Sequence, residues 1–172
     1  MKAGYKVILV GCLIFSAHTA HKKEVDRFHH DLRQQRITYE GMLTAQEIRL
    51  KDYFAAHGSP EPANAAKAVG RSKRPIQTAV IAKRESRANP KAVGDGGKSR
   101  GMYQVQGKYW GRVPKSMDGQ TDQHDKIMDD LVASSDPVQA IQNYNGAGPK
   151  AREYKRETVK ETIRLAQELG IK

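Results

Sequence analysis

The stretch "KRESRANPKAVGDGGKSRGMYQV", Lys83 to Val105, combines two acids with a run of glycines and decides how this chain folds. A helix-forming segment delivers Glu85, and Asn89-Pro90 ends that helix because the residue before proline resists the helical conformation. The glycines that follow have no Cβ atom and let a ligand approach the backbone closely. Asp95 lies among them. The stretch is therefore either a solvated loop between two helices or a site built around one or two carboxylates.

Glu85 belongs to the helical segment of residues 76–86, four residues after Ile81 and three after Ala82. Residues at these spacings share one face of a helix, so an inward-packing apolar face would bring Glu85 to the edge of the core. A carboxyl held against apolar surface has a raised pKa and can donate a proton near neutral pH. The alternative is a solvated glutamate between two arginines, Arg84 and Arg87.

Short helices are expected around this stretch, and no segment alternates well enough to predict a long strand. Residues 22–56 are mostly helix-forming, with one apolar stripe from Val25 to Leu43. A second helix is expected to start at Ala45, with Ile48, Tyr53 and Phe54 as candidates to pack inward. "HGSPEPAN" at 57–64 predicts a domain boundary. Further helices are expected at 65–70, 123–133, 137–144 and 150–169. We therefore expect an all-α domain over residues 59–172, with a small β-hairpin near the glycines. Residues 21–58 are expected to form a helical spacer or arm before it.

The first twenty residues have the layout of an export signal: two lysines, an apolar run from Val7 to Ala17, and Ala20 as the small residue before a cut. The run is too short to span a bilayer comfortably. "LVGC" resembles a lipobox, which would make Cys12 a lipid anchor. The alternatives are an uncleaved signal anchor and a buried N-terminal helix. The prediction is an exported protein of the periplasm or cell envelope, with membrane contact only through residues 1–20.

The chain has 172 residues and a formal net charge of +11, which would draw it to polyanions such as nucleic acid, anionic lipid or an acidic cell-wall polymer. The basic residues are scattered, without aromatic interleaving, and this argues against nucleic acid as the partner. A basic protein with no charged partner is the alternative. Cys12 is the single cysteine and the six histidines lack metal-ligand spacing, so neither a metal nor a cofactor is expected.

Three ordered blocks carry a resemblance to a known family. They are Glu85-Ser86 followed by Asn89-Pro90-Lys91-Ala92, then Gly101-Met102-Tyr103-Gln104, then "NYNGAGP" from Asn143 to Pro149. Together they resemble the signature of the soluble lytic transglycosylase domain and its relative, goose-type lysozyme, over about residues 62–165. Two departures concern the sugar contacts: Met102-Tyr103 stands where the family more often has Leu-Met, and Gly146-Ala147-Gly148 replaces the usual Ala-Gly.

The resemblance implies a lysozyme-like fold and cleavage of the β-1,4 bond between N-acetylmuramic acid and N-acetylglucosamine in peptidoglycan. Glu85 would protonate the glycosidic oxygen and then, as base, take the proton of the muramoyl 6-hydroxyl, which gives a 1,6-anhydro product. The resemblance also implies substrate-binding roles: Ser86 and Gln104 near the acid or the sugar amide, Tyr103 facing the sugar, Tyr144 hydrogen-bonding near Glu85, and Asn145 lining the groove.

The role of Asp95 determines whether a 1,6-anhydro product or a hydrolysis product is expected. An aspartate in this loop of goose-type lysozymes helps to position water, so inverting hydrolysis becomes feasible if Asp95 faces Glu85 at about 6.5–9.5 Å. The alternative, which we favour here, is a turn aspartate that bonds its own backbone, and with it the transglycosylase. A non-catalytic wall-binding or assembly module is the competing class. The expected partners are peptidoglycan strands and a phage lysis, secretion or conjugation machine.

Overall fold

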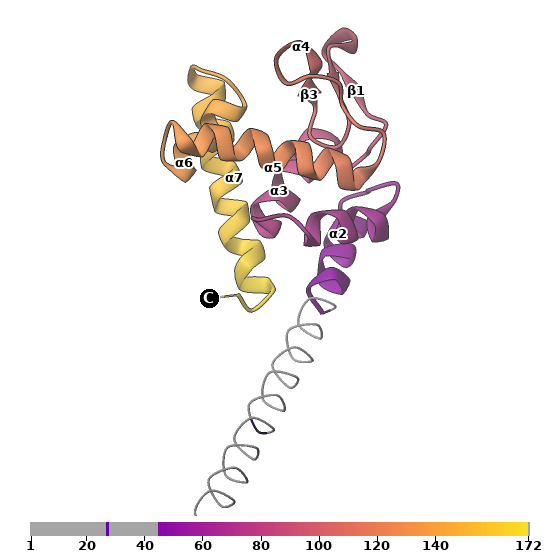
Figure 1. Ribbon diagram of the computed structural model, residues 1–172. Coiled ribbons are helices and arrows are strands. Elements are labelled where there is room, and N and C mark those ends of the chain that lie inside the picture. The colour runs from indigo at the N-terminus through magenta and orange to yellow at the C-terminus, as the bar shows by residue number, and fades with distance from the viewer. Residues whose placement is uncertain (1–26, 28–44, 172) are drawn as a thin grey trace, which may run out of the picture. The chain divides into compact units, whose positions relative to one another are not determined.

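The computed structural model describes Arg27 and residues 45–171 (Figure 1). The predicted export signal, Cys12 and most of the predicted spacer lie outside the described residues. A compact unit extends over Thr44–Lys172. It therefore begins before residue 59, where the sequence places the start of the domain.

Residues 45–56 are helical and belong to the compact unit rather than to a separate arm. Leu50, Tyr53 and Phe54 lie three to four positions apart, so they share one helix face, and all three are buried. The Tyr53 hydroxyl also donates a hydrogen bond of 2.8 Å to Oε1 of Glu161, far along the chain. Tyr53 and Phe54 therefore pack inward against the domain as expected, whereas Ile48 is 53% exposed. The predicted stripe from Val25 to Leu43 lies outside the described residues.

The elements that follow are six helices and three very short strands. The helices are α2 (Pro62–Gly70), α3 (Pro75–Ser86), α4 (Gly107–Trp110), α5 (Met117–Ala133), α6 (Pro137–Tyr144) and α7 (Pro149–Glu168). The strands are β1 (Val93–Gly94), β2 (Ser99–Arg100) and β3 (Val105–Gln106), with the 3-10 turn η1 (Asp95–Gly97) after β1. They form an antiparallel sheet in the order β1-β2-β3. The prediction of a helical domain with a small β element near the glycines is confirmed.

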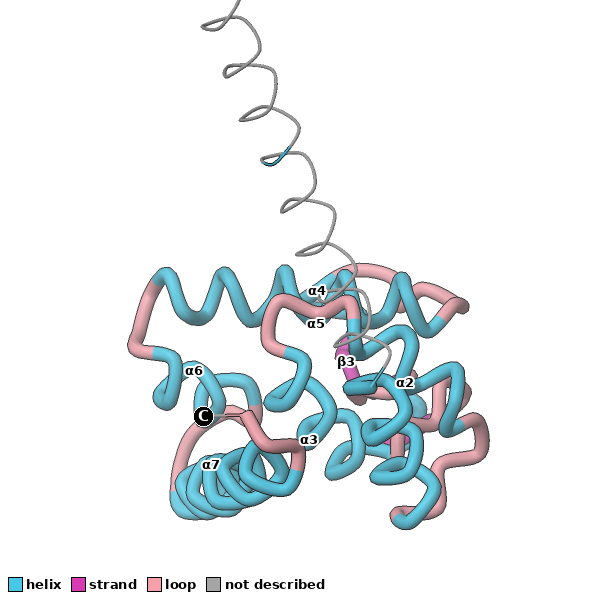
Figure 2. Tube along the Cα trace, turned by 90° about the horizontal axis from the view of Figure 1, so that it is seen from below, coloured by secondary structure: helices cyan, strands magenta, loops and turns pink. Residues whose placement is uncertain are grey.

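Helix α3 lies in the middle of the unit and packs against α2 on one side and α7 on the other (Figure 2). Its residues from Thr78 to Ala82 are buried, in agreement with the expected inward face. Pro75 opens the helix as predicted, since proline suits the first helical turn. At the other end Arg87 and Ala88 adopt left-handed φ angles of 58° and 56°, and Pro90 follows. The helix therefore stops one residue after Glu85.

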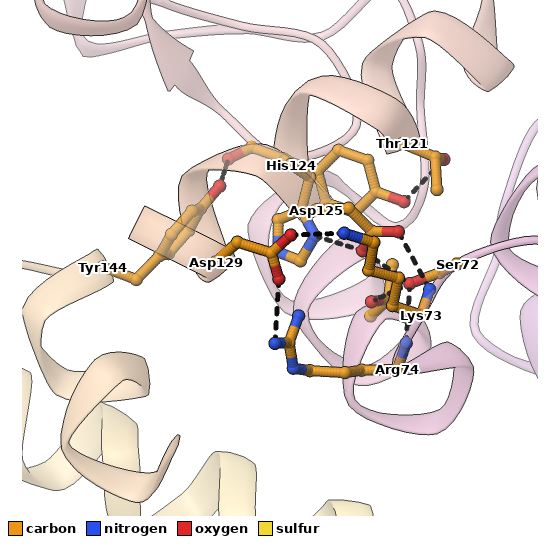
Figure 3. Close-up of polar contacts among 10 residues, drawn as sticks. Ser72, Lys73, Arg74, Thr121, His124, Asp125, Asp129 and Tyr144 are labelled. Carbon is orange, nitrogen blue, oxygen red and sulfur yellow. Dashed lines mark hydrogen bonds and ion pairs between the residues drawn. The ribbon is translucent and has the colours of Figure 1, made fainter. Parts of the chain in front are cut away.

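Carboxylates of α5 fix the start of α3 (Figure 3). Asp125 accepts hydrogen bonds from the Ser72 hydroxyl at 2.7 Å and from the Lys73 backbone N–H at 2.9 Å. One turn later, Asp129 accepts from the Arg74 guanidinium at 2.9 Å and from the Lys73 ammonium group. We call these contacts the α5 clamp. It holds the turn before α3 in place and so sets the direction in which that helix carries Glu85.

Candidate active site

Glu85 is half-buried at the C-terminal end of α3 and lines a cleft of about 370 Å³. The small sheet and α4 form one wall of the cleft, and the end of α6 with the loop after it forms another. Ile127 of α5 also contributes to the lining. The carboxyl therefore lies where the apolar interior meets an open hollow, as the spacing of Ile81, Ala82 and Glu85 predicts.

Tyr154 of α7 holds the Glu85 side chain. Its hydroxyl donates a hydrogen bond of 2.6 Å to Oε1 of Glu85. The Arg84 guanidinium lies over the ring of the same tyrosine, 5.1 Å from its centroid. Within residues 45–171 this phenol is the only hydrogen-bonding partner recorded for the Glu85 carboxyl. The acid thus has one neutral donor on one oxygen, while the other oxygen, Oε2, has none from that part of the chain.

The surroundings raise the pKa of Glu85 above its ordinary value. Burial makes the largest contribution, because removing a carboxylate from water disfavours its charged form. The hydrogen bond from Tyr154 and the positive charge of Arg84 oppose this effect, and the negative charge of Asp95 adds to it. Burial together with the adjacent Glu85 charge also raises the pKa of Tyr154, so its hydroxyl stays protonated and remains a donor.

Asp95 lines the same cleft from the sheet side. Its φ angle is 49°, and its Oδ2 accepts a hydrogen bond from the hydroxyl of Ser99 across the η1 turn. Its backbone carbonyl accepts from Lys98 N at 3.4 Å, so the residue also forms the turn. Asp95 therefore both forms the turn and lines the cleft, two roles that the sequence presents as alternatives. The two acids, Glu85 and Asp95, border one hollow.

Gln104 lies in the cleft wall, where the resemblance predicts it. Its side-chain N–H donates to the Gly101 carbonyl at 3.0 Å, and its Oε1 lies close over Gly94. A Cβ atom added at Gly94 would stand 2.1 Å from that oxygen, so only glycine leaves room for it. This close approach explains one glycine of the run: it lets Gln104 face the cleft.

Two tyrosines that the resemblance places at the substrate are arranged differently. Tyr144 lines the cleft, but its hydroxyl donates at 2.6 Å to the Tyr103 carbonyl and not to Glu85. Tyr103 has only 1% of its surface exposed, and its hydroxyl pairs with that of Thr121 at 2.9 Å. Its ring stacks on His124, with the centroids 4.3 Å apart. Tyr103 is therefore a core residue behind the cleft, because its side chain points away from the side that Gln104 faces.

Some of the other expected residues support the backbone around the site, and others line the cleft. The Ser86 hydroxyl donates to the Met102 carbonyl at 2.8 Å and accepts from Asn89 N at 3.0 Å, so it ties the end of α3 to the turn between β2 and β3. Ser86 does not line the cleft, whereas Asn145 does. Trp110, which the sequence leaves open between sugar contact and core anchor, also lines the cleft and is 40% exposed.

Sequence reasoning missed Tyr154, since the resemblance assigns the hydrogen bond near Glu85 to Tyr144. Tyr154 lies 69 positions after Glu85, within a segment of charged residues that reads as an ordinary solvated helix. No spacing rule links the two positions, because the packing of α7 on α3 brings them together.

The geometry suits proton transfer by a single carboxyl, with a second carboxylate across the cleft.

Throughout residues 45–171 and at Arg27, no group of three or more histidine, cysteine or acidic side chains is placed to hold a metal ion. None of the helices in that described part combines the length and apolar character needed to cross a bilayer.

Comparison of the chain with protein family models, with curated proteins and with solved structures gave no match.

Proposed function

We propose that this protein cleaves the β-1,4 bond between N-acetylmuramic acid and N-acetylglucosamine in peptidoglycan, with Glu85 as the proton donor. The observation that carries the proposal is the Glu85 carboxyl itself: half-buried, with a raised pKa, and bordering a cleft. A carboxyl in these surroundings can keep its proton closer to neutral pH and deliver it to a leaving oxygen.

The reaction that needs fewest groups is the lytic transglycosylase reaction. Glu85 protonates the glycosidic oxygen, and the bond from that oxygen to C1 of the muramoyl residue breaks. The resulting carboxylate then takes the proton of the muramoyl 6-hydroxyl, whose oxygen bonds to C1 and closes a 1,6-anhydro ring. Tyr154 holds Oε1 throughout, which leaves Oε2 to carry the proton. No second carboxylate takes part.

Hydrolysis is the second candidate, and the position of Asp95 favours it. Asp95 borders the cleft that contains Glu85, and the Ser99 hydroxyl fixes its carboxylate. An aspartate there could accept a proton from a water that attacks C1 while Glu85 protonates the leaving oxygen. This is the two-carboxylate arrangement of inverting glycosidases. The product would then have a reducing muramic acid end.

The test is digestion of purified peptidoglycan with the full-length protein, followed by mass spectrometry of the soluble products. We expect anhydromuropeptides, whose mass is lower by one water than that of the reducing products of a hydrolase. Asp95→Asn should then slow release only mildly, whereas a severe loss together with reducing ends would establish the hydrolase. If the wild-type protein releases nothing, the cleavage proposal fails and the wall-binding module remains.

A peptidoglycan substrate also requires that the domain reach the cell wall. Export to the periplasm or cell envelope, as the first twenty residues predict, would place it there. A role in opening the wall for a phage lysis, secretion or conjugation machine is consistent with such a location.

A further inference from the structure

The small sheet that carries Asp95 has two unlike faces. Successive side chains of a strand point to opposite faces, so Ser99 and Arg100 of β2 diverge. Ser99 lines the cleft, whereas Arg100 lines a separate hollow of about 580 Å³. Gln106 of β3 borders both spaces. The second hollow is therefore on the outer side of the cleft wall, and Gln106 lies between the two spaces.

The outer hollow is strongly basic. Its charged lining consists of five cations and no acid, and the cations are Lys98, Arg100, Lys108, Arg112 and Lys115. All five side chains are exposed. We call these five residues the basic face. The surrounding segment, residues 91–115, has six basic residues and one acidic residue, a net charge of +5, against +11 for the whole chain.

The cations of the basic face differ from a group of cations at the two ends of α3 and before it. Arg71, Lys73, Arg74, Lys83 and Arg84 each form an ion pair with an acid. Within the described residues no member of the basic face does so. Gathering like charges around one hollow is unfavourable, and a ligand with several negative groups would relieve that repulsion.

The lining also restricts the kind of anion. Only Gln106 and Val113, with two glycines, complete the hollow, so it presents no aromatic ring. Tyr109, whose ring centroid lies 5.4 Å from the Lys108 ammonium nitrogen, and Trp110 are exposed nearby, but both line the cleft and not this hollow. Single-stranded nucleic acids are usually held by bases stacked on aromatic side chains, and the hollow itself presents none. Lysines and arginines spread around an open hollow instead suit a flexible chain with separate negative groups. Because Gln106 borders both spaces, a ligand of the basic face would lie next to whatever occupies the cleft, which favours a group attached to the same molecule.

We propose that the basic face binds the carboxylates of the peptide stems attached to the glycan strand in the cleft. This inference rests on the proposed function and adds a substrate preference: strands that carry acidic stems. An extended peptide reaches about 3.3–3.6 Å per residue, so a four-residue stem extends about 13 Å from the glycan strand. β3 is an edge strand of the sheet and its Gln106 borders both spaces, so a stem that leaves the cleft at β3 would meet the basic face.

The test measures binding in the Glu85→Gln background, so that no strand is cut during the measurement. The probes are soluble, labelled glycan strands with their peptide stems, and the same strands after an amidase has removed the stems; fluorescence polarisation reports binding. Lys108→Glu with Arg112→Glu reverses two charges of the basic face. Lys67→Glu with Lys126→Glu, on α2 and α5, is the matched control, because both lysines are exposed and the net charge changes equally.

Stem-bearing strands should bind the Lys108→Glu, Arg112→Glu variant about tenfold more weakly, as two lost surface ion pairs would give. The control pair should bind them as the parent does, and stem-free strands should bind both variants equally. Added salt should remove most of the difference, since exposed charge pairs are screened.

Equal weakening by the control pair would show that only the overall charge matters and would overturn the inference. The inference would also be overturned if Lys108→Glu with Arg112→Glu weakened the binding of stem-free strands as much as that of stem-bearing strands. Tighter binding of soluble polyphosphate than of stem-bearing strands through the same residues would overturn it as well. Because binding needs no cleavage, loss of stem dependence leaves the cleavage proposal standing. Stem-dependent binding by a protein that never cleaves would, in turn, overturn the cleavage proposal alone.

Discussion

The carboxylates at the two ends of α3 have opposite surroundings. At its start, Asp125 and Asp129 of the α5 clamp receive two donors each, from side chains and from the backbone. At its end, Glu85 has one donor, the neutral hydroxyl of Tyr154. Hydrogen bonds from Lys73 and Arg74 hold the pKa of Asp129 below its ordinary value, whereas burial raises the pKa of Glu85.

The difference separates acids that join two elements from the acid that we propose as the proton donor. A carboxylate surrounded by donors and cations is stabilised in its charged form and joins two elements. A carboxyl left with one neutral donor at the border of a cleft is free to gain and lose a proton. Under the proposed function, α3 is attached at its start and carries the proton donor at its end, so Glu85→Gln, Asp125→Ala and Tyr154→Phe should each affect only one end.

The largest effect is expected from Glu85→Gln. Amide replacement keeps the shape of the side chain but removes the proton donor, and general acid catalysis contributes about 100-fold or more. We expect peptidoglycan release to fall by at least that factor, with the thermal unfolding midpoint unchanged. Glu153→Gln, on the exposed side of α7, is the control and should retain full activity. Substantial release by Glu85→Gln would mean that another group supplies the proton.

Asp125→Ala should destabilise the fold by about 3 kcal/mol, because it leaves the buried Ser72 hydroxyl and the Lys73 N–H without their acceptor. Urea unfolding followed by circular dichroism measures the change. Asp122→Ala, at an exposed position of the same helix, should stay within about 0.5 kcal/mol of the wild type. Equal stabilities of the two variants would show that the α5 clamp does not hold α3.

His124 should make stability depend on pH. It is 1% exposed, neither ring nitrogen has a hydrogen-bond partner within the described residues, and burial lowers its pKa to about 3. The unfolded chain binds the proton below a pKa of about 6.5 and the folded chain does not, so stability is lost as pH falls between these values. Between pH 7 and pH 5 the loss from this group is about 2 kcal/mol.

Urea unfolding at those two pH values checks the His124 prediction, with His124→Phe as the comparison. Phenylalanine keeps a ring against Tyr103 and does not titrate, so the variant should lose about 2 kcal/mol less on acidification. The same pH dependence in both proteins would refute the prediction.

Tyr154→Phe should have a smaller effect on cleavage, about tenfold, because one hydrogen bond to the acid is lost. That bond lowers the pKa of Glu85, so its removal should move the alkaline limb of the activity profile to higher pH. Tyr144→Phe is the control, since its hydroxyl bonds the Tyr103 carbonyl instead. An alkaline limb that moves in Tyr144→Phe but not in Tyr154→Phe would reverse our assignment of the two tyrosines.

The sequence predicts those parts of the site that depend on local rules. The face of α3 and its end before Pro90 follow from helix spacing and backbone sterics. Tyr154 does not, because only tertiary packing brings it to Glu85. The position of Tyr103 in the motif predicts a contact with the sugar. The structure instead buries Tyr103 in the core, while its neighbour Gln104 faces the cleft.

Two wider features were also beyond sequence reasoning. The apolar stripe of residues 45–56 indicates a helix but not the body on which it packs. The cations of the basic face look scattered over residues 98–115, and they surround one hollow only after the sheet and α4 have folded.

The proton-donor role of Glu85 is tested most directly by a carbon-13 NMR titration of the side-chain carboxyls of Glu85 and Asp129 in the folded protein. We predict that Glu85 titrates above the ordinary glutamate pKa, while Asp129 titrates below the ordinary aspartate pKa. A Glu85 pKa at or below the ordinary value would make it a solvated anion and contradict its assignment as the acid.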